Sequence, residues 1–396
     1  MSASPARYRQ RSSPSHERIG WLLFLLFVAA GIAYFPVTHH LKAASVLMNI
    51  AEPGAKGFVS DYAKNPIKTQ EFSLNVNGTA VRSRIYSPVG VERPPAVVIL
   101  HGVHHLGIEE PRLKNFARAM ASHGYMIMTP ELPGIDNYHV NAASIPVIGE
   151  AAKELTRWSG APKVGVLGLS FAGGLALIAA NDPNYAKNIA FVAAVGAQDD
   201  VARVLKFFAT NEIPLPEGGV EKLKAHEYGP LVVVYSHPQD FFKGKDAAIA
   251  TNAVQYILWE DSAKAHAEAA KMSPDGQKKM KLLFDHKTDA LAPMLLASID
   301  KYKAEYKPAS PRGNITSLKV PVFLLHGAAD DVIPSAETLW LEQDIPAGLV
   351  KARLISSVVS HVELEGDTSV QDEFDLVHWM SVMLDEADDS ARPARH

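Results

Sequence analysis

The spacing of apolar residues changes several times along the chain, and each change marks a different kind of element. Two stretches, EFSLNVNG and TAVRSRIYSP, alternate apolar and polar residues around Asn77-Gly78. An Asn-Gly pair between alternating stretches is the strongest short-range signal for a β-hairpin. We therefore expect two antiparallel strands here.

Almost wholly apolar runs then alternate with segments of helical spacing. Four such runs precede residue 200: Ala96–Leu100, Tyr125–Thr129, Val164–Leu169 and Ile189–Val195. Strands that are buried on both faces read as continuous apolar runs, and their alternation with helices is typical of a parallel sheet with helices on both faces. The pattern therefore predicts an α/β fold.

This alternation stops near residue 200 and resumes near residue 318. The segment between is mostly helical in spacing and richer in charge, and Pro321–Leu325 and Lys351–Ser356 then read as strands. One sheet interrupted by a helical cap is the simplest arrangement. The predicted division is a cytoplasmic tail at 1–18, a transmembrane signal-anchor at 19–38, a juncture at 39–68, a sheet-forming core at 69–200 and 318–388, a helical cap insertion at 201–317 and a polar tail at 389–396.

The anchor prediction depends on an apolar run near the N-terminus. Four arginines precede an uncharged run from Ile19 to Phe35, which Pro36 closes. This length is at the short end of what crosses a bilayer as a helix, and flanking arginines stay cytoplasmic. We therefore expect a single-pass membrane protein with a cytoplasmic N-terminus and an extracytoplasmic folded domain. A cleaved signal peptide and a buried helix of a soluble protein are the alternatives.

Composition narrows the class of protein. The 396 residues are 47% hydrophobic and 21% charged, which is ordinary for a globular protein. A net charge of -4 with mixed signs gives no electrostatic reason to expect a nucleic-acid partner. The chain has no cysteine, which excludes disulfides, thiolate metal sites and cysteine nucleophiles. We expect no cofactor, and the oligomeric state stays open.

The run Val164–Leu169 leads into the strongest chemical signal of the sequence. Gly168-Leu169-Ser170-Phe171-Ala172 is a G-x-S-x-A pattern, with a predicted strand before it and a helix rich in small residues after it. A serine on so sharp a turn needs small neighbours two residues away on either side, which Gly168 and Ala172 provide. The pattern predicts Ser170 as a nucleophile. A buried strand with an incidental Gly-Ser turn is the alternative.

A serine nucleophile needs a histidine base, and the base needs a carboxylate to orient it. In hydrolases with a serine on such a turn, the order along the chain is serine, acid, histidine. Asp330 follows one predicted strand and His361 follows the next, so both lie at the same edge of a parallel sheet as Ser170. We therefore predict that Ser170, Asp330 and His361 form a catalytic triad.

Other interpretations of these positions stay open. Asp331 is the alternative acid in the same loop, and Asp199 or Asp200, after the strand predicted at 189–195, is held in reserve. For His361 the alternative is an ordinary loop histidine.

Stabilising an oxyanion requires two hydrogen-bond donors. One is expected from the backbone N–H of Phe171, and the other from Val103, beside Gly102, which allows a close backbone approach. The histidines at 101, 104 and 105 of the same loop accompany no metal-ligand motif, so we predict no metal site. His104 is instead a candidate substrate contact.

Together these segments resemble the α/β-hydrolase superfamily, nearest to its dienelactone-hydrolase-like or acyl-peptidase-like esterases. The resemblance spans about 70–200 and 319–386 and is carried by His101-Gly102, GLSFAGG at 168–174, HGAADDVIP at 326–334 and the strand-end His361. It implies an eight-stranded, mostly parallel sheet, a cap inserted after the sixth strand, and hydrolysis of an ester, thioester or amide. It does not imply a particular substrate.

We therefore expect a serine hydrolase that cleaves a small-molecule carboxylic ester through a covalent acyl-enzyme. An acyltransferase would use the same acyl-enzyme, and a non-catalytic membrane-anchored binding protein would tolerate a broken triad. A dehalogenase or an epoxide hydrolase needs an aspartate in place of Ser170. In the cap, Tyr228 and Phe241 are candidate substrate contacts, with plain packing between cap helices as the alternative.

Overall fold

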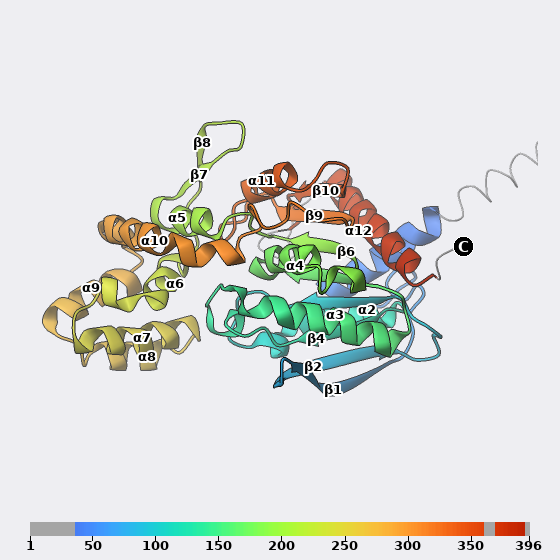
Figure 1. The fold of residues 1–396 in the computed structure, drawn as a ribbon, viewed down its shortest axis with the longest axis horizontal. Coiled ribbons are helices and arrows are strands. Elements are labelled where there is room, and N and C mark those ends of the chain that lie inside the picture. Colours follow the sequence, from blue (N-terminus) through green and yellow to red (C-terminus); the bar gives the residue numbers. More distant parts are fainter. Residues whose placement is uncertain (1–35, 360–368, 393–396) are drawn as a thin grey trace, which may run out of the picture.

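The computed structural model describes residues 36–359 and 369–392, and within them eight strands form one sheet (Figure 1). The strand order is β1-β2-β4-β3-β5-β6-β9-β10. β2 runs antiparallel to both of its neighbours, whereas the strands from β4 to β10 in this order are parallel. The strands are β1 (Ile67–Val76), β2 (Thr79–Pro88), β3 (Ala96–Leu100), β4 (Met126–Pro130), β5 (Val164–Leu169), β6 (Ile189–Val195), β9 (Val322–Gly327) and β10 (Val350–Ser356).

The Asn-Gly pair forms the turn between β1 and β2. Val76 pairs with Thr79, and the two residues between them, Asn77 and Gly78, both have positive φ, at 51° and 87°. Asparagine and glycine adopt this backbone conformation at the lowest cost, and two such residues give a turn whose twist matches the strands. This hairpin fixes the register of the antiparallel edge of the sheet.

Helices cover both faces of the sheet, so that each face has its own apolar core. The helices of this part of the chain are α2 (Pro111–Ser122), α3 (Ile145–Ser159), α4 (Phe171–Asn181), α11 (Ala336–Asp344) and α12 (Val370–Ser390). Ile148 of α3 and Leu175 of α4 are buried in one core, and Met120 of α2 and Trp379 of α12 in the other. Every residue of β3 and β5 is buried, as expected for strands packed on both faces.

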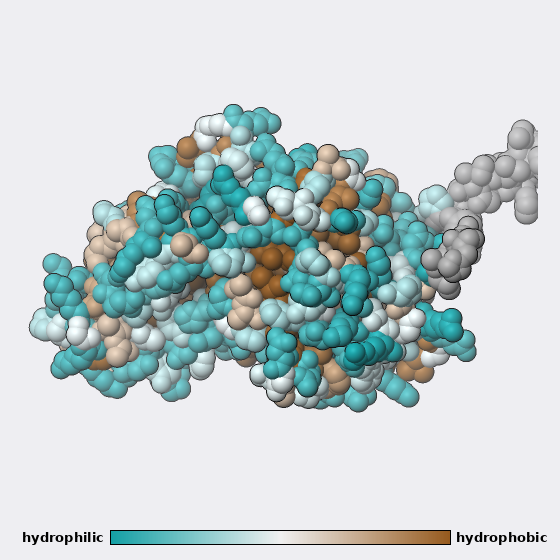
Figure 2. All heavy atoms as spheres, viewed as in Figure 1, coloured by the Kyte–Doolittle hydropathy of each residue, from teal (hydrophilic) through white to brown (hydrophobic). Residues whose placement is uncertain are grey.

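An insertion of helices follows β6 and ends before β9 (Figure 1). Its elements are α5 (Val201–Thr210), a hairpin of β7 (Glu212–Pro214) and β8 (Val220–Lys222), α6 (Gly229–Ser236), α7 (Lys245–Leu258), α8 (Ser262–Ala269), α9 (Pro274–Phe284) and α10 (Ala292–Tyr306). On the face drawn in Figure 2, apolar residues reach the surface near the middle, where the insertion meets the sheet. The junction between the two parts is therefore partly apolar.

The fold prediction was wrong in one part, the single transmembrane helix at 19–38. Among residues 36–359 and 369–392, no helix has the length and apolar character needed to cross a bilayer. Residues 19–35 lie outside the described residues. In the helix over residues 36–51, which follows them, Ala43 and Val46 are buried, whereas Val37 and Met48 are exposed. The extracytoplasmic location stays a prediction.

Helix 36–51 packs on the sheet core beside α12, as the blue and red helices in Figure 1 show. His39 contacts Asp385, and Lys42 Nζ lies 3.5 Å from the Asp388 carboxylate. Ser45 Oγ of the same helix lies 2.7 Å from Nε2 of the buried His123. The helix is thus attached to α2 and α12, the two helices on this face of the sheet.

Candidate active site

Ser170 occupies a sharp turn between β5 and α4. Its φ of 55° and ψ of -137° are unusual for a residue with a Cβ, and the side chain is only 2% exposed. The Ser170 N–H donates to the Val195 carbonyl at 2.8 Å, which ties the turn to β6. A Cβ at Gly168 would lie 2.5 Å from Gly173 Cα, so the turn requires glycine there. The backbone is therefore held in a strained conformation by its surroundings.

The loop after β3 passes directly against this serine. A Cβ at Gly102 would lie 3.2 Å from Ser170 Cβ and 3.9 Å from Ser170 Oγ. The absence of a side chain at Gly102 thus lets the backbone of this loop approach the hydroxyl. Val103 lines the cavity onto which Ser170 opens, and Phe171 is the first residue of α4, whose N-terminal N–H groups carry partial positive charge.

The histidines of this loop have different surroundings. His101 is buried, and its Nε2 accepts a hydrogen bond from the Leu132 N–H at 2.9 Å while Nδ1 lies 2.8 Å from the Gly102 carbonyl. His101 therefore holds the loop in place. His104 lines the cavity, and burial lowers its pKa. His105 stacks on His104 with ring centroids 4.7 Å apart. Within the part of the chain that the structure describes, no group of histidines and carboxylates could hold a metal ion.

The two aspartates after β9 are clearly distinguished by their surroundings. Asp330 is 1% exposed, and its Oδ1 accepts hydrogen bonds from the N–H groups of Val332 and Ile333, both at 2.9 Å. Its Oδ2 lies 3.4 Å from Nε2 of the buried His326. Asp331 instead lines the cavity. The Asp330 carboxylate is thus fixed in orientation, as a triad acid must be.

His361, the predicted base, lies outside the described residues. Val359, two residues before it, lines the same cavity as Ser170. The last described residue before His361 therefore lies at the cavity.

The reserve acids, Asp199 and Asp200, have other contacts. Asp199 is fully buried, and Arg203 Nη2 lies 2.8 Å from its Oδ2 and 3.0 Å from a carboxylate oxygen of Glu337. Asp200 caps α5, because its Oδ1 accepts from the Ala202 N–H at 2.9 Å. Neither lines the cavity of Ser170, so the structure does not bring them to the nucleophile.

Burial raises the pKa of Asp199 to about 7, and the nearby Glu337 adds to this effect. Since this folded-state pKa lies above the ordinary value of 3.8, stability should fall as the pH rises from about 4 to about 7. We expect Asp199→Asn to remove this dependence, so that wild type loses about 4 kcal/mol relative to the variant between pH 4 and pH 8. Urea unfolding at both pH values measures the difference. If the free energy of unfolding changed equally with pH in wild type and in Asp199→Asn, Asp199 would not have the raised pKa. The variant should keep its catalytic activity.

The cavity that Ser170 lines has a volume of about 1020 Å³ and is shared by the core, the insertion and helix 36–51. Two hydrogen bonds hold the insertion to the core here. The Tyr138 hydroxyl donates to the Leu258 carbonyl at 2.7 Å, and the His226 N–H donates to the Asp331 carbonyl at 2.8 Å. A cavity of this size is in the range of small-molecule sites.

Of the five predicted site residues outside the triad, three line this cavity, namely Val103, His104 and Tyr228, whereas Phe171 and Phe241 do not. Phe241 is 3% exposed and belongs to the apolar core of the insertion, so plain packing explains it.

The sequence analysis missed the contribution of helix 36–51. The i, i+3 spacing of Leu47 and Ile50 was a signal for an amphipathic helix, but it does not tell which partner the apolar face meets.

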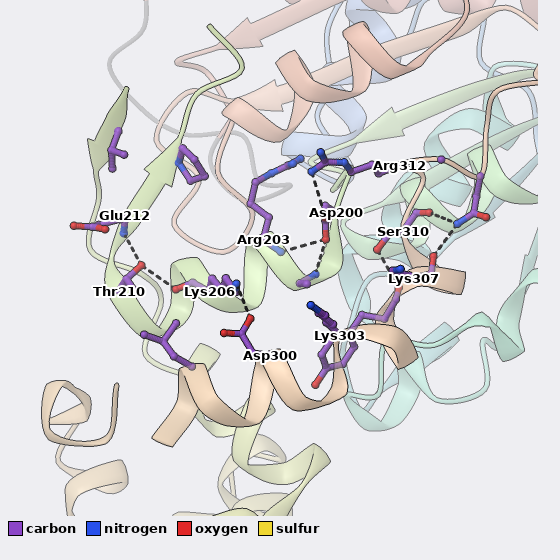
Figure 3. Close-up of a pocket in the computed structure, with 17 residues that line it drawn as sticks. Asp200, Arg203, Lys206, Thr210, Glu212, Asp300, Lys303, Lys307, Ser310 and Arg312 are labelled. Carbon is purple, nitrogen blue, oxygen red and sulfur yellow. Dashed lines mark hydrogen bonds and ion pairs between the residues drawn. The ribbon is translucent and has the colours of Figure 1, made fainter. Parts of the chain in front are cut away.

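A second cavity, of about 860 Å³, lies between α5, α10 and residues 307–314 (Figure 3). Its charged side chains are more often basic than acidic, and Figure 3 shows Lys206 paired with Asp300, at 2.7 Å, and Arg312 facing Asp200, at 3.5 Å. Ser170 and Asp331 are not among its lining residues. The predicted chemistry therefore belongs to the first cavity.

The strand order, the antiparallel second strand and the serine on a strained turn after β5 define the α/β-hydrolase fold. Solved structures with this fold are similar to the chain. The rice cell wall degrading esterase LipA from Xanthomonas oryzae has a TM-score of 0.50 and 12% identity, covering 84% of this chain and 94% of that one. The chain thus has the α/β-hydrolase fold, and the resemblance seen in its motifs is confirmed.

A Pyrococcus horikoshii acylaminoacyl peptidase has a TM-score of 0.49 and 13% identity over 85% of this chain. The chain covers 45% of that peptidase, so it spans under half of its length. No protein-family model matches the chain, and no curated protein matches it in sequence.

Proposed function

We propose that this protein is a serine hydrolase that cleaves a carboxylic ester of a small molecule, with Ser170 as the nucleophile. The observation that carries the proposal is the strained turn that places Ser170 on a cavity of about 1020 Å³ and against Gly102. A backbone strain of this kind persists only where surrounding structure maintains it, and it clusters at active sites. The hydrolase names of the structural neighbours agree with this class.

In the proposed reaction, Ser170 Oγ attacks the carbonyl carbon of the ester while His361 takes the hydroxyl proton. The N–H groups of Phe171 and Val103 stabilise the oxyanion, and Asp330 stabilises the imidazolium. Collapse of this intermediate breaks the bond to the alcohol oxygen, which receives the proton from His361. Water, deprotonated by His361, then cleaves the acyl-enzyme and releases the carboxylic acid.

A fluorophosphonate probe tests the assignment, because it reacts only with an activated serine. We expect one covalent adduct on the full-length protein, mapped by mass spectrometry to the peptide that contains Ser170, and hydrolysis of p-nitrophenyl acetate that the probe abolishes. Folded protein that neither reacts nor hydrolyses the ester would support the non-catalytic binding protein instead.

A further inference from the structure

Apolar side chains form much of the lining of the cavity of Ser170. Next to the nucleophile its lining comes from the carboxyl ends of strands, at Leu169, Val195 and Leu325. Further lining residues are aliphatic, aromatic or thioether side chains of helix 36–51, α2 and α12: Leu47, Ile50, Leu113, Phe116, Leu376 and Met380. One continuous cavity therefore has the nucleophile and an apolar surface from three helices.

Helix 36–51 presents two different sets of apolar residues. Ala43 and Val46 are fully buried in the core, whereas Leu47 and Ile50 are only half-buried and line the cavity. Half-buried aliphatic side chains on a cavity wall gain further burial when an apolar ligand enters. Leu47 and Ile50 also pack against the core, and other contacts hold the helix as well, because Ser45 contacts His123 and Asn49 Nδ2 donates to the Ser60 carbonyl at 2.8 Å.

The insertion gives the cavity a polar and mainly acidic side. Glu227 and Glu260 line it there, with His226 and His286, and His286 Nε2 lies 3.2 Å from the Glu227 carboxylate. Asp331, from the loop after β9, adds a third carboxylate to the lining. Arg112 also lines the cavity, but its Nε donates to Glu110 at 2.7 Å. These carboxylates disfavour an anionic leaving group such as a phosphorylated alcohol.

We propose that the substrate is an uncharged ester with an aliphatic chain of medium length, and that helix 36–51 forms one wall of the chain-binding pocket. This inference rests on the proposed function and adds the substrate class to it. The apolar chain lies along Leu47 and Ile50, and the alcohol part faces the insertion. Each methylene that enters the pocket should raise kcat/KM about threefold to fourfold until the pocket is full.

The test compares p-nitrophenyl acetate with p-nitrophenyl octanoate on the full-length protein. Wild type should have the higher kcat/KM for the octanoate, by more than tenfold. Ile50→Trp fills the pocket from helix 36–51 and should lower the octanoate-to-acetate ratio of kcat/KM at least tenfold. Met48→Trp is the matched control, because Met48 is on the same helix, is 43% exposed and does not line the cavity, so this variant should keep the wild-type ratio.

Leu47→Ala is a second variant, in which the smaller side chain widens the pocket, so that the preferred acyl chain of the ester should become longer. Unlike Ile50→Trp, this variant does not require the fold to accommodate a larger side chain. An unchanged ratio in both Ile50→Trp and Leu47→Ala would overturn the assignment of the wall, as would a wild type that prefers the acetate. In either case fluorophosphonate labelling at Ser170 would still support the serine hydrolase. Absence of both labelling and turnover would instead mean that the proposed function itself had failed.

Discussion

Replacement of Ser170 by alanine should lower kcat for p-nitrophenyl esters by a factor on the order of 10⁴ or more, with almost no change in stability. The nucleophile and its base act as a unit, so loss of the hydroxyl removes the whole covalent route. Alanine keeps the Cβ and hence the φ of 55° that strains the turn. Steady-state kinetics measures the loss of kcat, and urea unfolding measures the change in stability.

Ser170→Gly is the matched variant for the strain. It should be as inactive as Ser170→Ala but more stable by about 1 kcal/mol, because glycine adopts positive φ without a steric penalty. Substantial activity in either variant would show that another residue is the nucleophile. Equal stability of the two would show that the turn is not strained.

Asp330→Asn should also reduce kcat strongly, by a factor on the order of 10³ to 10⁴, because an asparagine cannot stabilise the imidazolium form of the base. Asp331→Asn is the control in the adjacent position, and it should reduce kcat less than tenfold. The distinction rests on burial and on the two N–H groups that fix the Asp330 carboxylate. Kinetics on the same ester series measures both variants. A larger loss in Asp331→Asn would assign the acid to the second aspartate.

The sequence was most informative where local rules dictate the backbone. Asn77-Gly78 specifies its own turn, and the small neighbours of Ser170 allow only a narrow range of structures at that position. The continuous apolar runs are likewise typical of strands that are buried on both faces of a sheet. These features could be predicted because each depends on a few residues close together in the chain.

Features that depend on distant segments could not be predicted in the same way. Periodicity shows that Leu47 and Ile50 share a helix face, but the face meets α2 and α12 only in the folded chain. Phe241 and Tyr228 are both aromatic residues of the insertion, and only its packing separates a core residue from a cavity residue. The transmembrane prediction at 19–38 rested on the length of an apolar run and its flanking charge alone.

The contact between helix 36–51 and α12 has a consequence for the order of folding. His39 and Asp385 are separated by 346 positions in the chain, whereas the hydrogen bond that ties Ser170 to Val195 joins residues much closer in the chain, the turn after β5 and the end of β6. Closing the longer loop costs more entropy, although this cost grows only slowly with length, and contacts of high sequence separation form slowly. During synthesis the serine turn can therefore form while the C-terminal part is still being made. The apolar wall between the two helices is completed only after α12 has been synthesised.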